Sequence, residues 1–287
     1  MVARDLKIVE CPRDAMQGIH PFIPTEQKIA FINSLLKVGF DTLDVGSFVS
    51  PKVIPQLRDT AEYLDKIDLS QTDTKLLTIV ANTRGALQAE TFEQVDYMGF
   101  PFSISPTFQL RNTNKTMEQS YDEVKKMNDI CLRSNKELVV YLSMGFGNPY
   151  GEEWNTDIVA HWVEQMDKIG IKILSLSDTI GTSTPETITE LFSHLIPAYP
   201  HIEMGAHLHT HPHNWKEKID AAWKNGCRRI DTAVKGFGGC PMAEDVLVGN
   251  MPTENLLTYC AEHKIETGLN TLAFESAYNE ALKTFPL

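Results

Sequence analysis

The alternation of short β-rich runs with amphipathic helical patterns is the feature that most constrains how this chain folds. Eight strand-then-helix units follow one another along the 287 residues. Repeated βα units predict a parallel sheet, because each helix carries the chain back to the start of the next strand. Eight units predict that the sheet closes into a (β/α)8 TIM barrel. The expected strands are 6–11, 42–45, 76–80, 102–105, 138–143, 173–176, 202–209 and 229–234.

The helical patterns between these runs complete the barrel. In the stretch 25–38, the residues Ile29, Ile32, Leu35 and Leu36 form one apolar face. A doubly wound sheet is the weaker alternative, because no Gly-x-Gly-x-x-Gly follows the first strand. We expect one catalytic domain over 1–287, with the barrel at about 5–265 and a helical extension at about 266–287. The expected helices are 25–38, 59–67, 83–94, 116–134, 155–169, 185–198, 215–224, one after Pro252, and an additional C-terminal helix over 269–287.

Composition narrows the class of protein and its partners. The net charge of -12 argues against nucleic acid as the main partner, although a local basic pocket can still bind an anionic small ligand. No apolar run reaches 18 residues, so no membrane span is expected. Five scattered cysteines without paired spacing suit a reducing compartment. Met1 leads almost directly into an apolar run, which leaves no room for a signal peptide, and we expect a cytoplasmic protein.

Polar side chains stand at the ends of nearly all the expected strands. In a TIM barrel the active site lies at the C-terminal ends of the strands. A barrel built only for packing would not need Arg13, Asp14 and Asp178 on one rim. In chain order the polar positions are Glu10, Arg13, Asp14, Asp44, Ser47, Asn82, Ser103, Ser105, Ser143, Asp178, Thr179, His207, His209 and the loop 235–240.

Four histidines occupy alternate positions in one stretch, from His207 to His213. Residues two apart on a strand point to the same face, so His207 and His209 would present two imidazoles side by side. With Asp14 they would make a site for a divalent ion with coordination positions left open. Zinc is an alternative, although no cysteine has a structural-zinc spacing. We expect His211 and His213 to be surface loop residues.

A glycine-rich loop, Gly-Phe-Gly-Gly-Cys-Pro, follows the last strand at 236–241. Three glycines suggest mobility or a close approach of backbone to ligand. Cys240 at its tip could act as acid, base or nucleophile if the pocket adjusts its pKa. The alternative is a tight phosphate-binding turn with an incidental thiol. We expect Cys11, Cys131 and Cys260 to be packing residues.

Six short segments then combine into one pattern. They are 7–14 (KIVECPRD) with Gln17, 47–52 (SFVSPK) with Pro55 and Gln56, 175–181 (SLSDTIG) with Thr184 and Pro185, 207–209 (HLH), 236–241 (GFGGCP), and Gly249 with Asn250. In this order, each at a strand end, they resemble the hydroxymethylglutaryl-CoA lyase family of the metal-dependent lyase and Claisen-synthase barrels. The similarity extends over most of the chain.

This resemblance implies cleavage of 3-hydroxy-3-methylglutaryl-CoA to acetyl-CoA and acetoacetate, with Mg²⁺ or Mn²⁺. It also implies an acyl-CoA substrate and a homodimer. By position, Arg13 matches the residue that stabilises the enolate oxygen, and Asp178 and His207 match groups near the substrate hydroxyl. Cys240 matches a catalytic cysteine on a mobile loop. The implied metal ligands are Asp14, His207, His209 and Asn250, and the expected substrate contacts are Gln17, Asp44, Ser47, Ser143 and Thr179.

The chemistry of a retro-Claisen cleavage fits these residue types. The C3 hydroxyl must lose a proton, which a coordinated metal favours, and the C2–C3 bond then breaks toward the thioester to leave an enolate. A fixed guanidinium such as Arg13 at that oxyanion contributes a few kcal/mol, on the order of other oxyanion donors. Cys240 would protonate the enolate carbon under a closed loop, with water excluded.

Several positions depart from the family pattern. Asp44 stands where the family commonly has Glu, and Ala15-Met16 replace Gly-Leu. Thr210 replaces the Asp that follows the family's second histidine. The chain here is shifted by a residue, so a pairing of His209 with His211 is an alternative to the pairing of His207 with His209. The departures bear more on acyl-CoA specificity than on reaction type.

Three other functions remain open from the sequence. The first is a Claisen-condensing synthase of the isopropylmalate or citramalate kind, but such enzymes usually carry further C-terminal domains. The second is a lyase acting on a related 3-hydroxyacyl-CoA. The third is a catalytically silent barrel that binds a metal or an acyl-CoA, and the intact Arg13, Asp14 and Cys240 argue against it.

Overall fold

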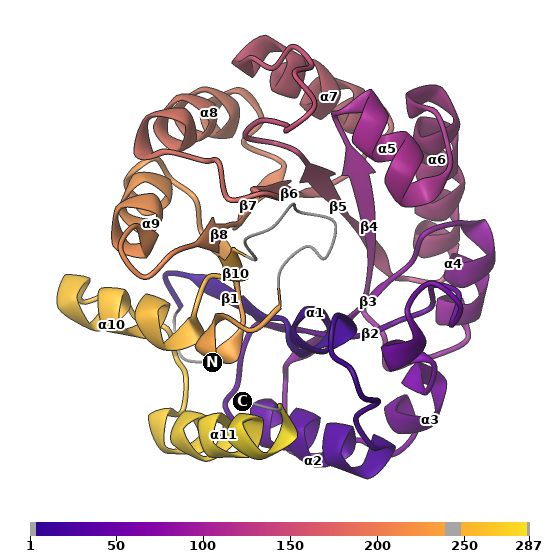
Figure 1. The fold of residues 1–287 in the computed structure, drawn as a ribbon, viewed down its shortest axis with the longest axis vertical. Coiled ribbons are helices and arrows are strands. Elements are labelled where there is room, and N and C mark those ends of the chain that lie inside the picture. The colour runs from indigo at the N-terminus through magenta and orange to yellow at the C-terminus, as the bar shows by residue number, and fades with distance from the viewer. Residues whose placement is uncertain (1–3, 239–247, 286–287) are drawn as a thin grey trace.

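Eight parallel strands close into a barrel in the computed structural model, which describes residues 4–238 and 248–285. The strand order is β1-β2-β3-β4-β5-β6-β7-β9, and β9 pairs with β1 to complete the ring (Figure 1). The predicted (β/α)8 barrel is confirmed. The strands are β1 (Lys7–Glu10), β2 (Thr42–Ser47), β3 (Lys75–Ile79), β4 (Tyr97–Ser103), β5 (Glu137–Ser143), β6 (Ile173–Ser177), β7 (Glu203–His207) and β9 (Arg229–Thr232), with a small antiparallel pair formed by β8 (His209–Thr210) and β10 (Gly249–Asn250).

Helices form a layer outside the ring of strands (Figure 1). Their amphipathic faces pack on the outer side chains of the barrel, while residues such as Leu77, Val139 and Ile173 form a smaller, separate buried cluster. The helices are α1 (Pro12–Gln17), α2 (Thr25–Leu36), α3 (Thr60–Leu64), α4 (Thr83–Glu90), α5 (Pro106–Thr113), α6 (Met117–Arg133), α7 (Thr156–Lys168), α8 (Pro185–Ala198), α9 (Trp215–Lys224), α10 (Thr253–His263) and α11 (Thr271–Thr284), with short 3-10 turns η1 (Pro55–Leu57) and η2 (Val234–Gly236).

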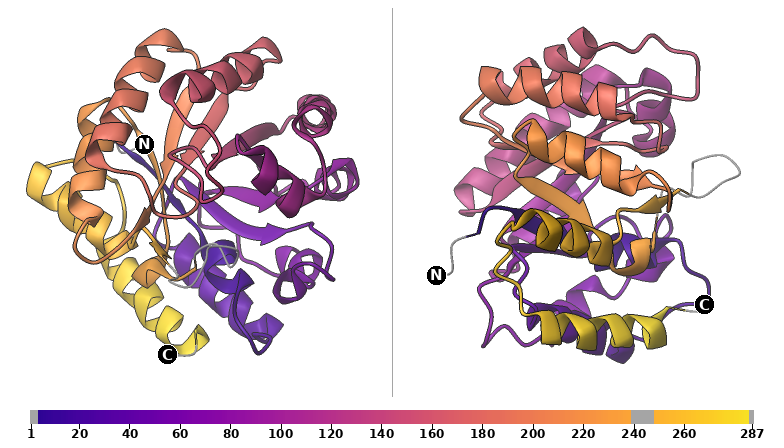
Figure 2. Two further views of the ribbon diagram at one scale, coloured as in Figure 1. Left: turned by 45° about the horizontal axis from the view of Figure 1, so that its top comes forward. Right: turned by 90° about the vertical axis from the view of Figure 1, so that its left-hand side faces the viewer.

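The additional C-terminal helix α11 packs alongside α2, as the views in Figures 1 and 2 agree. Phe285, just after α11, meets Phe31 of α2 edge to face with ring centroids 5.3 Å apart. Phe274 of α11 contacts Phe40 in a similar geometry at 6.5 Å. These aromatic contacts hold the extension against the start of the barrel. Among the described residues, the helices lack an apolar stretch of the length that a membrane span requires.

The fourth strand differs from its sequence prediction. We expected 102–105, but β4 begins at Tyr97 and ends at Ser103. Gly99 and Pro101 lower the strand propensity of this stretch, so the sequence pattern did not predict the first half of β4. The β3–β4 ladder ends at Gly99, whose carbonyl accepts a hydrogen bond from the N–H of Val80. Pro101 has no N–H to donate, but it lies beyond this ladder and so does not interrupt it.

The carboxyl of Glu10, at the end of β1, is fully buried beside the last strand. It accepts hydrogen bonds from the N–H of Val234 and from the hydroxyls of Thr232 and Thr253. Burial outweighs these bonds and raises the pKa of Glu10 to about 8. Because the folded-state pKa lies above the unfolded value of 4.5, folding favours the protonated form.

Replacing Glu10 with Gln should flatten the pH dependence of stability. The wild-type free energy of unfolding should fall as pH rises from 4.5 to about 8, with this group contributing up to about 1.4 kcal/mol per pH unit. Gln imitates the protonated carboxyl and removes that contribution, which urea unfolding across this range would measure. The exposed Glu62→Gln serves as the control, and a Glu10→Gln curve parallel to wild type would refute the assignment.

Candidate metal and substrate site

The short helix α1 brings three polar side chains to the barrel mouth. Pro12 stands at its first position, where its fixed φ and missing N–H suit a helix start. Arg13 donates through Nη1 to Asp14 Oδ1 at 2.9 Å and to Gln17 Oε1 at 2.8 Å. Residues at positions i, i+1 and i+4 of one helical turn thus form a single hydrogen-bonded group.

Asp44, on the neighbouring strand β2, fixes the other side of the Arg13 guanidinium. Its carboxylate accepts from Arg13 Nε at 3.0 Å and from Nη2 at 2.5 Å. Burial alone would lower the pKa of Arg13, but the carboxylates of Asp44 and Asp14 raise it. The guanidinium is therefore a permanent, rigidly oriented cation at the floor of the site.

Asp14, His207 and His209 converge at this mouth. One potential ligand atom from each lies within 4.8 Å of the others. Burial, followed by the charge of His207, lowers the pKa of His209 to about 4, so its imidazole is neutral. Burial acts to raise the pKa of Asp14, but Arg13 and His207 lower it. A carboxylate and imidazoles held this close are a donor set that fits a divalent ion.

Asn250 reaches the site through the β8–β10 pair. It stands opposite His209 in the antiparallel register. Its amide Nδ2 donates to Asp14 Oδ2 at 2.6 Å and to the carbonyl of Phe237 at 2.9 Å. In this arrangement Asn250 supports Asp14 through its N–H, and its own role as a metal ligand stays a prediction.

The structure separates the two histidine pairings that the sequence left open. His207 and His209 lie with ring centroids 5.4 Å apart beside Asp14. His211 stacks instead on His213, with ring planes only 6° from parallel. The grouping with Asp14 therefore involves His207 and His209 among the described residues.

Asp178 is not where we expected a catalytic group. Its carboxylate is fully buried and accepts from Lys218 Nζ at 2.9 Å and from Ser183 Oγ at 2.5 Å. Lys218 also donates to the carbonyl of His209 at 2.9 Å. The neighbours of Asp178 along the chain, Ser177 and Thr179, line the site cavity, and Asp178 points away from it, as alternation of side chains requires. Asp178 therefore contacts Lys218, which donates to the backbone of His209, and is not among the residues that line the cavity.

A cavity of about 350 Å³ opens beside the three potential ligands. Of the expected substrate contacts, Gln17, Ser143 and Thr179 line it. Asp44 and Ser47 do not, because both are buried and bonded elsewhere: Asp44 to Arg13, and Ser47 through its Oγ to the N–H of Val49 at 3.1 Å. Cys240 lies outside the described residues. The apolar part of the lining consists of Val49, Val53, Ile54, Ile79, Ala81, Pro101 and Phe108.

Two charged residues of this region escaped the sequence analysis. Lys218 is a fully buried lysine in α9, and Asp231 is a buried carboxylate on β9 whose Oδ2 lies 3.1 Å from His207 Nδ1. Burial acts to lower the pKa of His207, but the hydrogen bond and charge of Asp231 raise it. The available signal for Asp231 was a carboxylate in a strand of the barrel, two residues after Arg229, because charged residues are rarely fully buried unless they are paired.

Comparison with known proteins gives a consistent family relationship. Residues 6–280 match the model of the HMGL-like family. The hydroxymethylglutaryl-CoA lyase of Bacillus subtilis is 31% identical, over 90% of this chain and 85% of that protein. The solved HMG-CoA lyase of Brucella melitensis superposes with a TM-score of 0.90 at 30% identity, covering 99% of this chain and all of that one. A structure of an HMG-CoA lyase from Acinetobacter baumannii with coenzyme A and 3-methylmalate has a TM-score of 0.88 at 31% identity, covering 97% and 91%.

Exchanging single histidines should identify the ligand pair. His207→Asn should weaken Mn²⁺ binding by at least the ~10–100-fold typical of losing an outer partner, because a direct donor is removed. His211→Asn, the matched control from the stacked pair, should leave the affinity unchanged. Free Mn²⁺ measured by electron paramagnetic resonance gives both dissociation constants. Equal losses in the two variants, or a loss only in His211→Asn, would contradict the grouping.

Proposed function

The chain belongs to the HMGL-like family, and from this premise we propose that it is a divalent-metal-dependent lyase that cleaves 3-hydroxy-3-methylglutaryl-CoA to acetyl-CoA and acetoacetate. The observation that supports this most is the convergence of Asp14, His207 and His209 beside the fixed guanidinium of Arg13. Mg²⁺ or Mn²⁺ is the proposed ion, as the family resemblance implies, and the carboxylate of Asp14 is a ligand type that suits both. When bound, the ion supplies Lewis-acid polarisation of substrate oxygens.

Arg13 is proposed to bind the oxygen of the enolate that forms when the C2–C3 bond breaks. A guanidinium has five N–H groups. Four donate to Asp44, Asp14 and Gln17, one each from Nε and Nη2 and two from Nη1. The second N–H of Nη2 remains for the oxyanion, and the salt bridges hold it in position without further reorganisation.

His207 lines the cavity and, as a metal ligand, is proposed to lie near the C3 hydroxyl of the substrate. Cys240, which follows η2 in the chain, is proposed to deliver a proton to the enolate carbon. Asp178 is proposed to act indirectly, by holding Lys218 against the backbone of His209.

The remaining proposals concern the setting of the enzyme. The coenzyme A bound by the Acinetobacter baumannii lyase supports an acyl-CoA substrate here. We further propose a single catalytic domain over 1–287 that forms a homodimer in the cytoplasm. Free, buried thiols at Cys11, Cys131, Cys227 and Cys260 agree with a reducing compartment.

The apolar wall of the cavity favours one second candidate. Ile79, Pro101 and Phe108 line the same cavity as Arg13 and Asp14. Such a wall would accept an apolar C3 substituent larger than methyl. A lyase for that related 3-hydroxyacyl-CoA is therefore the alternative to be compared in the assay.

Purified protein with Mg²⁺ or Mn²⁺ should convert 3-hydroxy-3-methylglutaryl-CoA to equal amounts of acetyl-CoA and acetoacetate. Chromatography of the thioesters and an enzymatic assay of acetoacetate measure this directly. Higher kcat/KM for a substrate with a longer apolar C3 substituent would favour the second candidate. Condensation of acetyl-CoA with a 2-oxo acid, in the absence of cleavage, would contradict both.

Arg13→Lys should lower kcat by roughly 10²–10³-fold, because one oxyanion donor and the forked contact with Asp44 are lost. Mn²⁺ affinity should change only a few-fold, since Asp14 and both histidines remain. Arg133→Lys is the matched control, because Arg133 makes a similar forked pair with the surface residue Glu90. A wild-type kcat for Arg13→Lys would remove Arg13 from the mechanism.

A further inference from the structure

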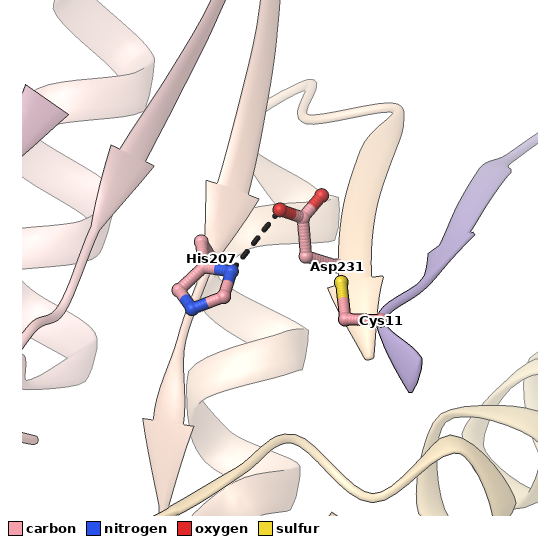
Figure 3. Close-up of side chains that lie close together, drawn as sticks. All are labelled: Cys11, His207 and Asp231. Carbon is pink, nitrogen blue, oxygen red and sulfur yellow. Dashed lines mark hydrogen bonds and ion pairs between the residues drawn. The ribbon is translucent and has the colours of Figure 1, made fainter. Parts of the chain in front are cut away.

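The imidazole ring of His207 contacts a carboxylate on the neighbouring strand. His207 ends β7, and Asp231 is its direct partner in the β7–β9 register. His207 Nδ1 lies 3.1 Å from Asp231 Oδ2, and the Asp231 side chain is only 1% exposed. Figure 3 shows the carboxylate pointing at the ring nitrogen, with Cys11 nearby, directly after the end of β1.

This contact decides which ring nitrogen can act as a donor to a metal. A neutral imidazole carries one proton, so one nitrogen donates a hydrogen bond and the other keeps a lone pair. A carboxylate only accepts, and it therefore selects the form of His207 with the proton on Nδ1. The lone pair is then on Nε2, the ring nitrogen that remains free to bind an ion with Asp14 and His209.

We propose that Asp231 is a positioning residue that holds His207 with Nδ1 protonated, so that its Nε2 lone pair points at Asp14 and His209. Without the carboxylate, the ring would be free to rotate and to place a proton on the nitrogen that should bind the ion. The link of this contact to catalysis rests on the proposed function, but the state of the ring does not.

Arg229 supports an anionic acceptor at this position. It stands two residues before Asp231 on β9, so both side chains point to the same face of the strand. Its side chain is fully buried, with Nη1 3.0 Å from Glu203 Oε1. A side chain at Gly205 would meet the Arg229 stem at 3.2 Å, so that glycine makes room for the cation inside the barrel. Burial acts to lower the pKa of Arg229, but Asp231 leads the charges that raise it.

Cys11 suggests an alternative in which His207 and Asp231 bind a metal ion directly together with its thiol. Its thiol, His207 and Asp231 also lie within 4.8 Å of one another, which is a donor set for a soft metal. Burial raises the pKa of the Cys11 thiol well above its usual value, and its Sγ lies 3.9 Å from the carbonyl of Val9. A protonated thiol and an Nδ1 that already donates to Asp231 both favour the positioning role.

The wild-type protein without metal tests the proposal before any substitution at Asp231. Nitrogen-15 NMR of histidine-labelled protein at mildly alkaline pH distinguishes the two neutral forms of imidazole, and His207→Asn identifies the signal. The proposal expects the proton on Nδ1 of His207. A proton on Nε2 would overturn it, whether or not the protein proves to be a lyase.

Asp231→Asn then tests the consequence. The amide can donate as well as accept, so His207 should lose its single protonation form, and the Mn²⁺ dissociation constant should rise by about 10–100-fold. Asp167→Asn is the matched control, because it alters a second histidine–carboxylate pair, with His201 at 2.6 Å on the surface. Unchanged Mn²⁺ affinity in Asp231→Asn would overturn the proposal. So would a Cd²⁺–thiolate absorption band that Cys11→Ser abolishes, because it would show the three residues acting as ligands.

Discussion

The pairing of β9 with β1 is the contact on which the rest of the site depends. Lys7 to Glu10 run in register with Arg229 to Thr232, and this ladder closes the ring of eight strands. The closure brings the first strand, and with it Asp14, beside chain segments about two hundred residues later. Hydrogen bonds from Asn250 to Asp14 and from the N–H of Val234 to Glu10 cross the same seam. The potential metal ligands are therefore neighbours only in the closed barrel.

Charge balance explains why so many ionisable groups can be buried at this end of the barrel. Arg13 lies between Asp44 and Asp14, and Lys218 is paired with Asp178. Each pair would be costly to break, because removing one partner leaves an uncompensated buried charge. The arrangement also holds the rim in one geometry. A site that presents a guanidinium and two imidazoles together requires such a fixed geometry.

The sequence predicted what depends on periodicity and on strand ends. Hydrophobic periodicity predicted the eight βα units and the C-terminal helix. Because the strand ends of a barrel meet at one rim, the sequence also predicted that this rim carries Arg13, Asp14, His207 and His209. It did not predict which way a strand-end side chain points. Asp178 lies between two residues that line the cavity and so faces the opposite side, toward Lys218.

Other differences have local physical causes. Helix α1 is only six residues long, too short to show an apolar periodicity, and Pro12 at its first position was the available signal. The start of β4 was hidden by Gly99 and Pro101, whose propensities the ladder overrides. The contact between His207 and Asp231 depends on the register of two neighbouring strands, which no spacing along the chain reveals.

The binding of one divalent ion between His207 and His209, beside Asp14, is the proposal on which the site depends most. Electron–nuclear double resonance on the Mn²⁺-loaded protein, labelled with nitrogen-15 only in histidine, measures the coupling of the metal to imidazole nitrogens. We expect couplings from two histidines in the wild-type protein and from one in His207→Asn. Coupling to fewer than two histidines in the wild type, or two couplings that persist in His207→Asn, would contradict it.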